Sequence, residues 1–66
     1  MLIATDKKGN KAEIKYRPAN ERAEHWLITF SFVKGTAQTY WAMDEVKAKQ
    51  MVQQVLGKVD WEVKDE

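Results

Sequence analysis

The residues that could do acid–base chemistry are few and lie apart from one another. His25 is the one histidine, and it stands between Glu24 and the apolar run that begins at Trp26. A catalytic histidine needs a nucleophile or substrate proton within reach and a group that orients its ring, and the neighbouring sequence offers neither. We therefore expect His25 to be an exposed residue at the start of a strand.

The carboxylates near the end of the chain are the next candidates for chemistry. Asp60 and Glu62 alternate in DWEVK and would share one face of a strand, but Lys64 follows on that face. A water-exposed strand lacks the burial that prepares an acid pair for catalysis. Each of the turn sequences KKGN and VKGT has a lone glycine, which makes no phosphate loop, and His, Asp and Glu show no metal-ligand spacing. We predict no enzyme, no catalytic residue, no metal, no cofactor and no small-molecule substrate.

Basic residues gather near the start of the chain, although the net charge is only +1. Residues 1–35 carry seven Lys and Arg against four acids, and residues 36–66 carry four against six. The excess lies in one stretch, DKKGNKAEIKYR, which contains Lys7, Lys8, Lys11, Lys15 and Arg17. This distribution predicts a basic hairpin, the kind of surface that attracts phosphates.

The composition is that of a small folded domain. The chain has 66 residues, 44% of them hydrophobic and 32% charged, so we expect one domain spanning residues 1–66. It contains no cysteine and no apolar run long enough to span a membrane. These features favour a cytoplasmic protein without a membrane association, and the small size suggests a bacterial or bacteriophage factor.

Four strands in two hairpins are expected before residue 44. In the first hairpin a four-residue KKGN loop would place Asp6 opposite Lys11 and Ile3 opposite Ile14. In the second, a two-residue Lys34-Gly35 turn would pair Phe30 with Thr39. That register puts Trp26, Ile28, Phe32, Trp41 and Met43 on the apolar face with Phe30, and leaves Tyr40 on the polar face.

The period then changes to that of a helix. Asp44 is a predicted N-cap, Glu45 is an acid in the first turn, and Gly57 occupies a C-terminal cap position. The apolar stripe consists of Ala48, Met51, Val52, Val55 and Leu56. Beyond the cap, VDWEV alternates apolar and charged residues, which predicts a fifth strand at an exposed edge.

These elements predict an α+β fold of two layers, in the order β-β-β-β-α-β. An antiparallel sheet of four or five strands would carry one helix packed on one face. A helix of about 13 residues spans about 20 Å. Such a helix would leave part of a core with three tryptophans uncovered, and a second copy of the chain could cover the rest. A homodimer is therefore one expectation.

The polar face of the sheet is the expected binding surface. Its candidate residues are Lys11, Lys15, Arg17, Thr29, Gln38 and Tyr40. Lysine and arginine can contact phosphates and a tyrosine ring can stack on a base, so single-stranded nucleic acid is one possible ligand. A solvated face of mixed charge is the alternative, because Glu13 lies within the basic stripe and the stretch ITFSFVKG lacks the RNP spacing.

Two functions remain open from the sequence. The first is a small non-enzymatic binding protein, an accessory factor that presents a sheet face or edge to a protein partner or to its own copy. The alternative is a single-stranded nucleic-acid-binding protein that uses the basic first hairpin. The order of several antiparallel strands followed by one helix resembles that of single-strand-binding transcription coactivators, and this architectural resemblance implies the second function.

Overall fold

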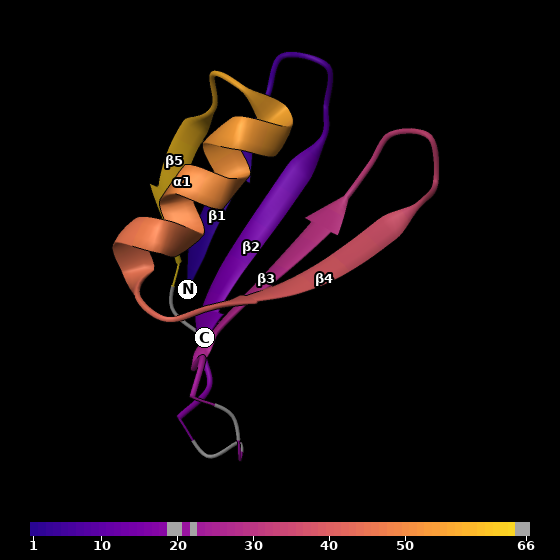
Figure 1. Cartoon of the computed structure of the whole chain (residues 1–66). Coiled ribbons are helices and arrows are strands. Elements are labelled where there is room, and N and C mark those ends of the chain that lie inside the picture. Colours follow the sequence, from indigo (N-terminus) through magenta and orange to yellow (C-terminus); the bar gives the residue numbers. More distant parts are fainter. Residues whose placement is uncertain (19–20, 22, 65–66) are drawn as a thin grey trace.

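The computed structural model describes residues 1–18, 21 and 23–64 of the chain. They form an antiparallel sheet with one helix packed on it (Figure 1). The strands are β1 (Leu2–Thr5), β2 (Lys11–Tyr16), β3 (Trp26–Ser31), β4 (Ala37–Ala42) and β5 (Asp60–Val63), and the helix is α1 (Glu45–Leu56). The sheet has five strands in the order β4-β3-β2-β1-β5, which confirms the predicted fold class and element order. The sequence ANERAE, residues 19–24, predicts a polar connector or a short helical turn, and this stretch lies partly outside the described residues.

Both hairpins have three-residue loops with the same pattern of backbone hydrogen bonds. In the first loop the Gly9 N–H donates to the Asp6 carbonyl at 3.3 Å, and the Asp6 N–H donates to the Asn10 carbonyl at 3.1 Å. In the second, the Gly35 N–H donates to the Phe32 carbonyl at 2.9 Å. The third loop residue has φ of 92° at Gly9 and 94° at Gly35, the left-handed region that favours glycine. This is a turn followed by a glycine bulge.

The three-residue loops shift both predicted registers by one position. Ile14 pairs with Leu2 rather than Ile3, and Phe30 pairs with Gln38 rather than Thr39. The predicted four-residue and two-residue loops were therefore wrong. A shift of one residue moves a strand's side chains to the other face of the sheet. Every residue of β4 therefore lies on the face opposite to the one predicted for it.

The hairpin loops are joined by a small polar network. The Asp6 carboxylate accepts hydrogen bonds from the Lys8 N–H, the Asn10 N–H and Asn10 Nδ2, each at 2.9 Å. The side-chain bond from Asn10 is the main cause that lowers the pKa of Asp6, because it stabilises the charged form. Asn10 Oδ1 in turn accepts the Val33 N–H at 2.9 Å, which ties the first loop to the second.

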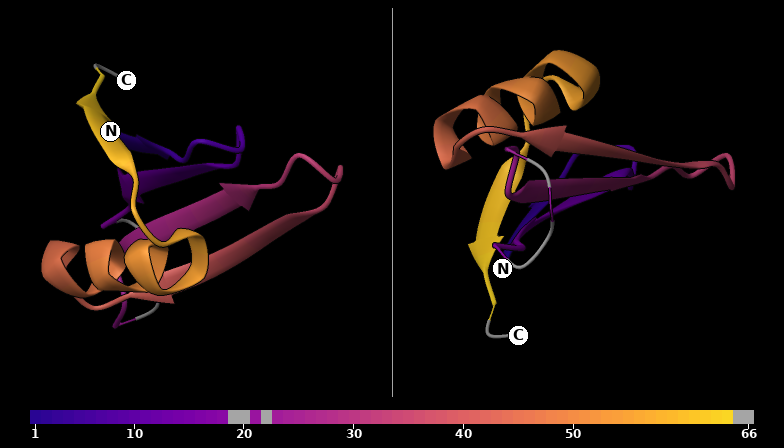
Figure 2. Two further views of the ribbon diagram at one scale, coloured as in Figure 1. Left: turned by 90° about the horizontal axis from the view of Figure 1, so that it is seen from above. Right: turned by 60° about the horizontal axis from the view of Figure 1, so that its bottom comes forward.

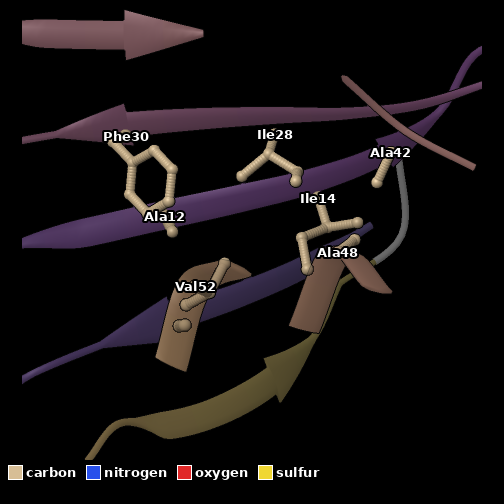
Figure 3. Packing of buried hydrophobic residues seen from close by; sticks show 8 residues of the cluster. Ala12, Ile14, Ile28, Phe30, Ala42, Ala48 and Val52 are labelled. Atoms are coloured by element: carbon tan, nitrogen blue, oxygen red, sulfur yellow. The ribbon is translucent and has the colours of Figure 1, made fainter. Parts of the chain in front are cut away.

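The core lies between α1 and one face of the sheet, which we call the helix face; the opposite side is the open face (Figure 2). Figure 3 shows Ala48 and Val52 projecting from α1 toward the sheet. The fully or almost fully buried residues of this cluster are Ala4, Ala12, Ile14, Ile28, Phe30, Ala42, Ala48 and Val52. Half of them are alanine, and these small side chains let the helix approach the sheet closely.

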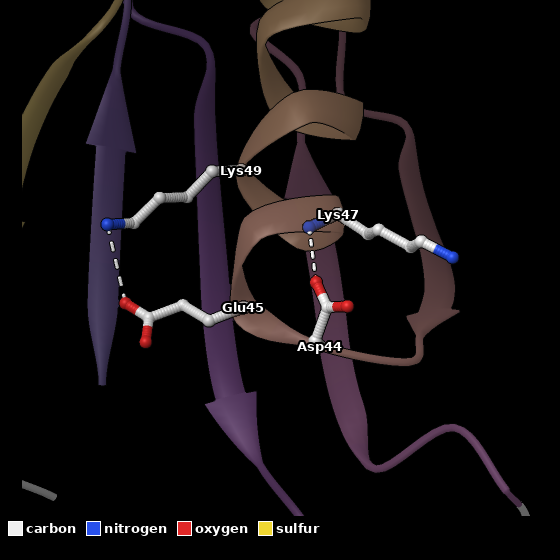
Figure 4. Close-up of polar contacts among 4 residues, drawn as sticks. All are labelled: Asp44, Glu45, Lys47 and Lys49. Carbon is white, nitrogen blue, oxygen red and sulfur yellow. Dashed lines mark hydrogen bonds and ion pairs between the residues drawn. The ribbon is translucent and has the colours of Figure 1, made fainter.

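The helix is capped as its sequence predicts. The Lys47 N–H donates to the Asp44 carboxylate at 2.8 Å, and Glu45 forms an ion pair with Lys49 at 3.4 Å (Figure 4). At the other end the Gly57 N–H donates to the Gln53 carbonyl at 2.8 Å, with Gly57 at φ 79°. These caps fix the length of α1 at 12 residues, and so limit how much of the sheet it covers.

Candidate interaction surfaces

The register divides the six predicted site residues between the two faces. Lys11, Lys15 and Thr29 lie on the open face, because Thr29 pairs with Glu13 and Lys15 with Leu27. Arg17 follows the end of β2 and is exposed. Gln38 and Tyr40 were expected on the same face as these basic residues. They lie instead on the helix face, with their partners on β3, so this part of the prediction was wrong.

Tyr40 belongs to the rim of the core. Its ring meets Phe30 edge-on, with centroids 5.7 Å apart, and its hydroxyl donates to Gln38 Oε1 at 2.6 Å. The side chain is 39% exposed. Tyr40 thus packs against the rim of the core and does not join the basic residues of the open face.

The open face carries a different aromatic residue. Trp41 pairs with Leu27, and Leu27 pairs with Lys15, so the three form one row across β4, β3 and β2. Trp41 and Leu27 are both half-buried, although the sequence pattern placed Trp41 in the core. Lys11, at the other end of β2, forms an ion pair with Glu13 at 3.4 Å. This pair offsets part of the basic charge on the face.

The helix leaves a groove on its own side of the sheet, beside the first turn of α1. The groove has a volume of about 340 Å³. It is lined by Met1, Leu2, Ile14, Tyr16, Trp26, Glu45 and Val63, and among these Glu45 alone has a charged side chain. We call it the apolar groove. It is the part of the helix face that a 12-residue helix does not reach, as the sequence predicted in general terms.

Two aromatic rings form one wall of the apolar groove. Tyr16 and Trp26 are directly opposed on β2 and β3, and their rings lie 4.9 Å apart. Trp26 was predicted to lie on the apolar face and is half-buried, whereas Tyr16 is 52% exposed. His25 adds an edge contact with Tyr16 at 6.3 Å and is itself half-buried, so it is less exposed than expected. Val63, on β5, is 77% exposed.

A second hollow lies near the other end of α1 and has a different character. Its volume is about 320 Å³, and its walls combine Phe32, Val55 and Leu56 with Lys7, Lys8, Lys58, Asp6 and Asn10. The carboxylate of Asp6 already accepts three hydrogen bonds within its own loop. This hollow is therefore much more polar than the apolar groove.

Two other features are absent from the described residues. Among residues 1–18, 21 and 23–64, no three His, Cys, Asp or Glu side chains are grouped so that they could hold a metal ion. Nor does this part of the chain contain a helix with the length and apolarity needed to cross a bilayer. Comparison with protein-family models, with curated proteins and with solved structures found no match to the chain.

Proposed function

We propose that the chain is a non-enzymatic interaction protein that binds a protein partner through the apolar groove. The observation that carries this proposal is the exposure of large apolar side chains around a hollow. Tyr16 is 52% exposed and Val63 77% exposed at the groove, although both belong to strands of the sheet. Contiguous apolar surface of this kind is typical of places where proteins bind one another.

The chemistry of the groove indicates what it would hold. Its walls are mostly apolar: the Glu45 carboxylate is already paired with Lys49 at 3.4 Å, and the Met1 amino group donates to the Lys64 carbonyl at 3.0 Å. A bulky apolar side chain of a partner protein suits such walls, because transferring it from water is favourable and requires no new polar contact. Tyr16 and Trp26 are the residue types that most often anchor protein interfaces. The absence of cysteine from the sequence is in keeping with a reducing compartment such as the cytoplasm.

The proposal is tested by placing a charge in the groove. Tyr16→Glu and Val63→Glu should each reduce capture of the partner from an extract of the native host at least about tenfold, since a carboxylate must lose its water when an apolar side chain enters. Val33→Glu is the matched control, because Val33 is 65% exposed at the tip of the second hairpin. It should capture the same partner as the unaltered chain.

Circular dichroism and thermal unfolding would show that the three variants fold. If both groove variants fold and still retain the partner at the level of the Val33→Glu control, the groove is not the contact surface.

A second candidate is single-stranded nucleic acid on the open face. The observation in its favour is the row formed by Lys15, Leu27 and Trp41, which sets an indole ring and a cation on one surface. A base can stack on the ring while the cation contacts a phosphate. Arg17, exposed at the end of β2, adds a second positive charge near Lys15.

This candidate predicts a dependence on salt. Lys15→Glu combined with Arg17→Glu should abolish binding to a single-stranded oligonucleotide, and each lost phosphate contact should flatten the slope of log affinity against log salt by about 0.7. Lys47→Glu combined with Lys58→Glu changes the net charge equally, but these exposed residues lie on α1 and just after it, so the variant should retain most of the slope. Absence of binding by the unaltered chain to DNA and RNA at low salt would eliminate this candidate.

A further inference from the structure

The two edges of the sheet differ in how well they are protected from other strands. β5 has four residues, two of them the charged Asp60 and Glu62. β4 has six residues, and AQTYWA contains neither a charge nor a proline. Charges, proline and short length are the usual features that prevent an edge strand from pairing with another chain. β5 has two of them, and β4 has none.

The register shows which backbone groups of β4 point outward. Phe32 N–H donates to the Thr36 carbonyl at 2.9 Å, so Phe32 and Thr36 form a hydrogen-bonded pair at the end of the hairpin. Bonded and non-bonded pairs alternate along an antiparallel ladder. Gln38 and Tyr40 therefore bond to β3, while the N–H and C=O groups of Ala37 and Thr39 point away from it. In the described part of the chain, β4 has a strand neighbour on one side only.

We propose that this edge binds β4 of a second copy of the chain, antiparallel and around a two-fold axis at Thr39. Thr39 then lies opposite Thr39 of the second copy and exchanges both backbone hydrogen bonds with it. Ala37 lies opposite Trp41, a small side chain against a large one. Gln38 lies opposite Tyr40. Opposed residues share a face, so both helices lie on the same side of one continuous sheet.

Charge and symmetry favour a second copy as the occupant. An antiparallel pair around a two-fold axis uses the same surface twice, so a strand without charge meets no like charge in its copy. The same register brings Lys34, in the hairpin loop, toward Asp44 of the second copy, at the other end of β4. Opposite charges therefore meet at both ends of the paired strands.

The inference goes beyond the proposed function and does not depend on it. Tyr16 and Val63 lie on β2 and β5, and β3 separates β2 from β4. Dimerisation through β4 therefore leaves the apolar groove uncovered in both copies. The sequence-based expectation of a homodimer rested on leftover apolar area, whereas the structure assigns the contact to an edge.

A pair of charge variants tests the axis at Thr39, which is exposed. The unaltered chain should sediment as a dimer between micromolar and hundred-micromolar concentration. Thr39→Lys alone and Thr39→Glu alone should each sediment at half that mass, because like charges would face each other across the axis. An equimolar mixture of the two should sediment as a dimer again. Thr29→Lys is the matched control, since Thr29 pairs with Thr39 one strand further in, and it should remain dimeric.

Hydrogen exchange gives a second measurement on the unaltered chain. The Thr39 amide should be protected at high concentration and lose its protection on dilution, because its bond is made only in the dimer. A monomer throughout the concentration range, a dimeric Thr39→Lys variant, or a mixture that stays monomeric would each overturn the inference. Thr39→Lys should still capture the groove's partner and Tyr16→Glu should still dimerise, so the two proposals fail separately.

Discussion

Phe30→Ala will lower the free energy of unfolding by about 3 to 5 kcal/mol, enough to unfold much of the protein. Phe30 is the largest fully buried side chain, and its ring stacks on Phe32 at 5.9 Å and meets Tyr40 at 5.7 Å. Alanine would remove contacts with both rings and leave a cavity that a sheet and one short helix cannot close. A chain of this size has little stability to spare.

Urea unfolding followed by tryptophan fluorescence or circular dichroism measures the effect. Tyr40→Ala is the comparison, because Tyr40 touches the same ring but is 39% exposed. It should cost clearly less than Phe30→Ala. Equal losses for the two variants would show that burial of the Phe30 ring contributes no more to stability than the exposed Tyr40 ring.

Val52→Asp should also unfold the domain. Val52 is fully buried on the side of α1 that packs on the sheet, and an unpaired carboxylate there costs several kcal/mol even after the protein relaxes. Burial would raise the pKa of the new carboxyl above its unfolded value, so its destabilising effect should grow as pH rises and shrink in acid.

The matched control is Gln53→Asp, which introduces the same group one residue later at an exposed position. Circular dichroism at neutral pH should show a folded Gln53→Asp variant and an unfolded Val52→Asp variant. Equal stability of the two would mean that α1 does not pack on the sheet through Val52.

The order and type of the elements could be predicted because their signals are local. Asp44 and Glu45 mark the start of α1 and Gly57 marks its end, and each acts as its type predicts. Alternation of apolar and polar residues is equally local, and it identified the strands. Contacts within one element decide these features, so a single sequence is enough to predict them.

The registers could not be predicted, because they depend on one loop residue each. Gly9 and Gly35 were recognised as turn residues, but whether a loop has two, three or four residues depends on where the left-handed φ falls. In both loops glycine is the third residue, after a lysine, and the ladder resumes immediately after it. The shared x-Lys-Gly pattern was the available signal for a bulged three-residue loop.

The shift of one residue between β3 and β4 explains the errors at the candidate sites. It moved Tyr40 to the helix face and Trp41 to the open face, because side chains alternate along a strand. The sequence predicted that one helix would leave part of the apolar face uncovered, but it did not predict where. The part of a sheet that a helix covers depends on how the two pack together. Ala4, Ala12 and Ala48 are fully buried in that packing, and a periodicity pattern gives such small residues little weight.

Site-specific photo-crosslinking tests the groove as a protein-binding site most directly. A benzophenone amino acid placed at Tyr16 should form a covalent adduct with one protein in an extract of the native host, and Val63→Glu in the same chain should prevent the adduct. The same group at Val33, which is 65% exposed but distant from the groove, should form none with that protein. Failure of the Tyr16 probe to form an adduct, or equal adducts from Tyr16 and Val33, would contradict binding in the groove.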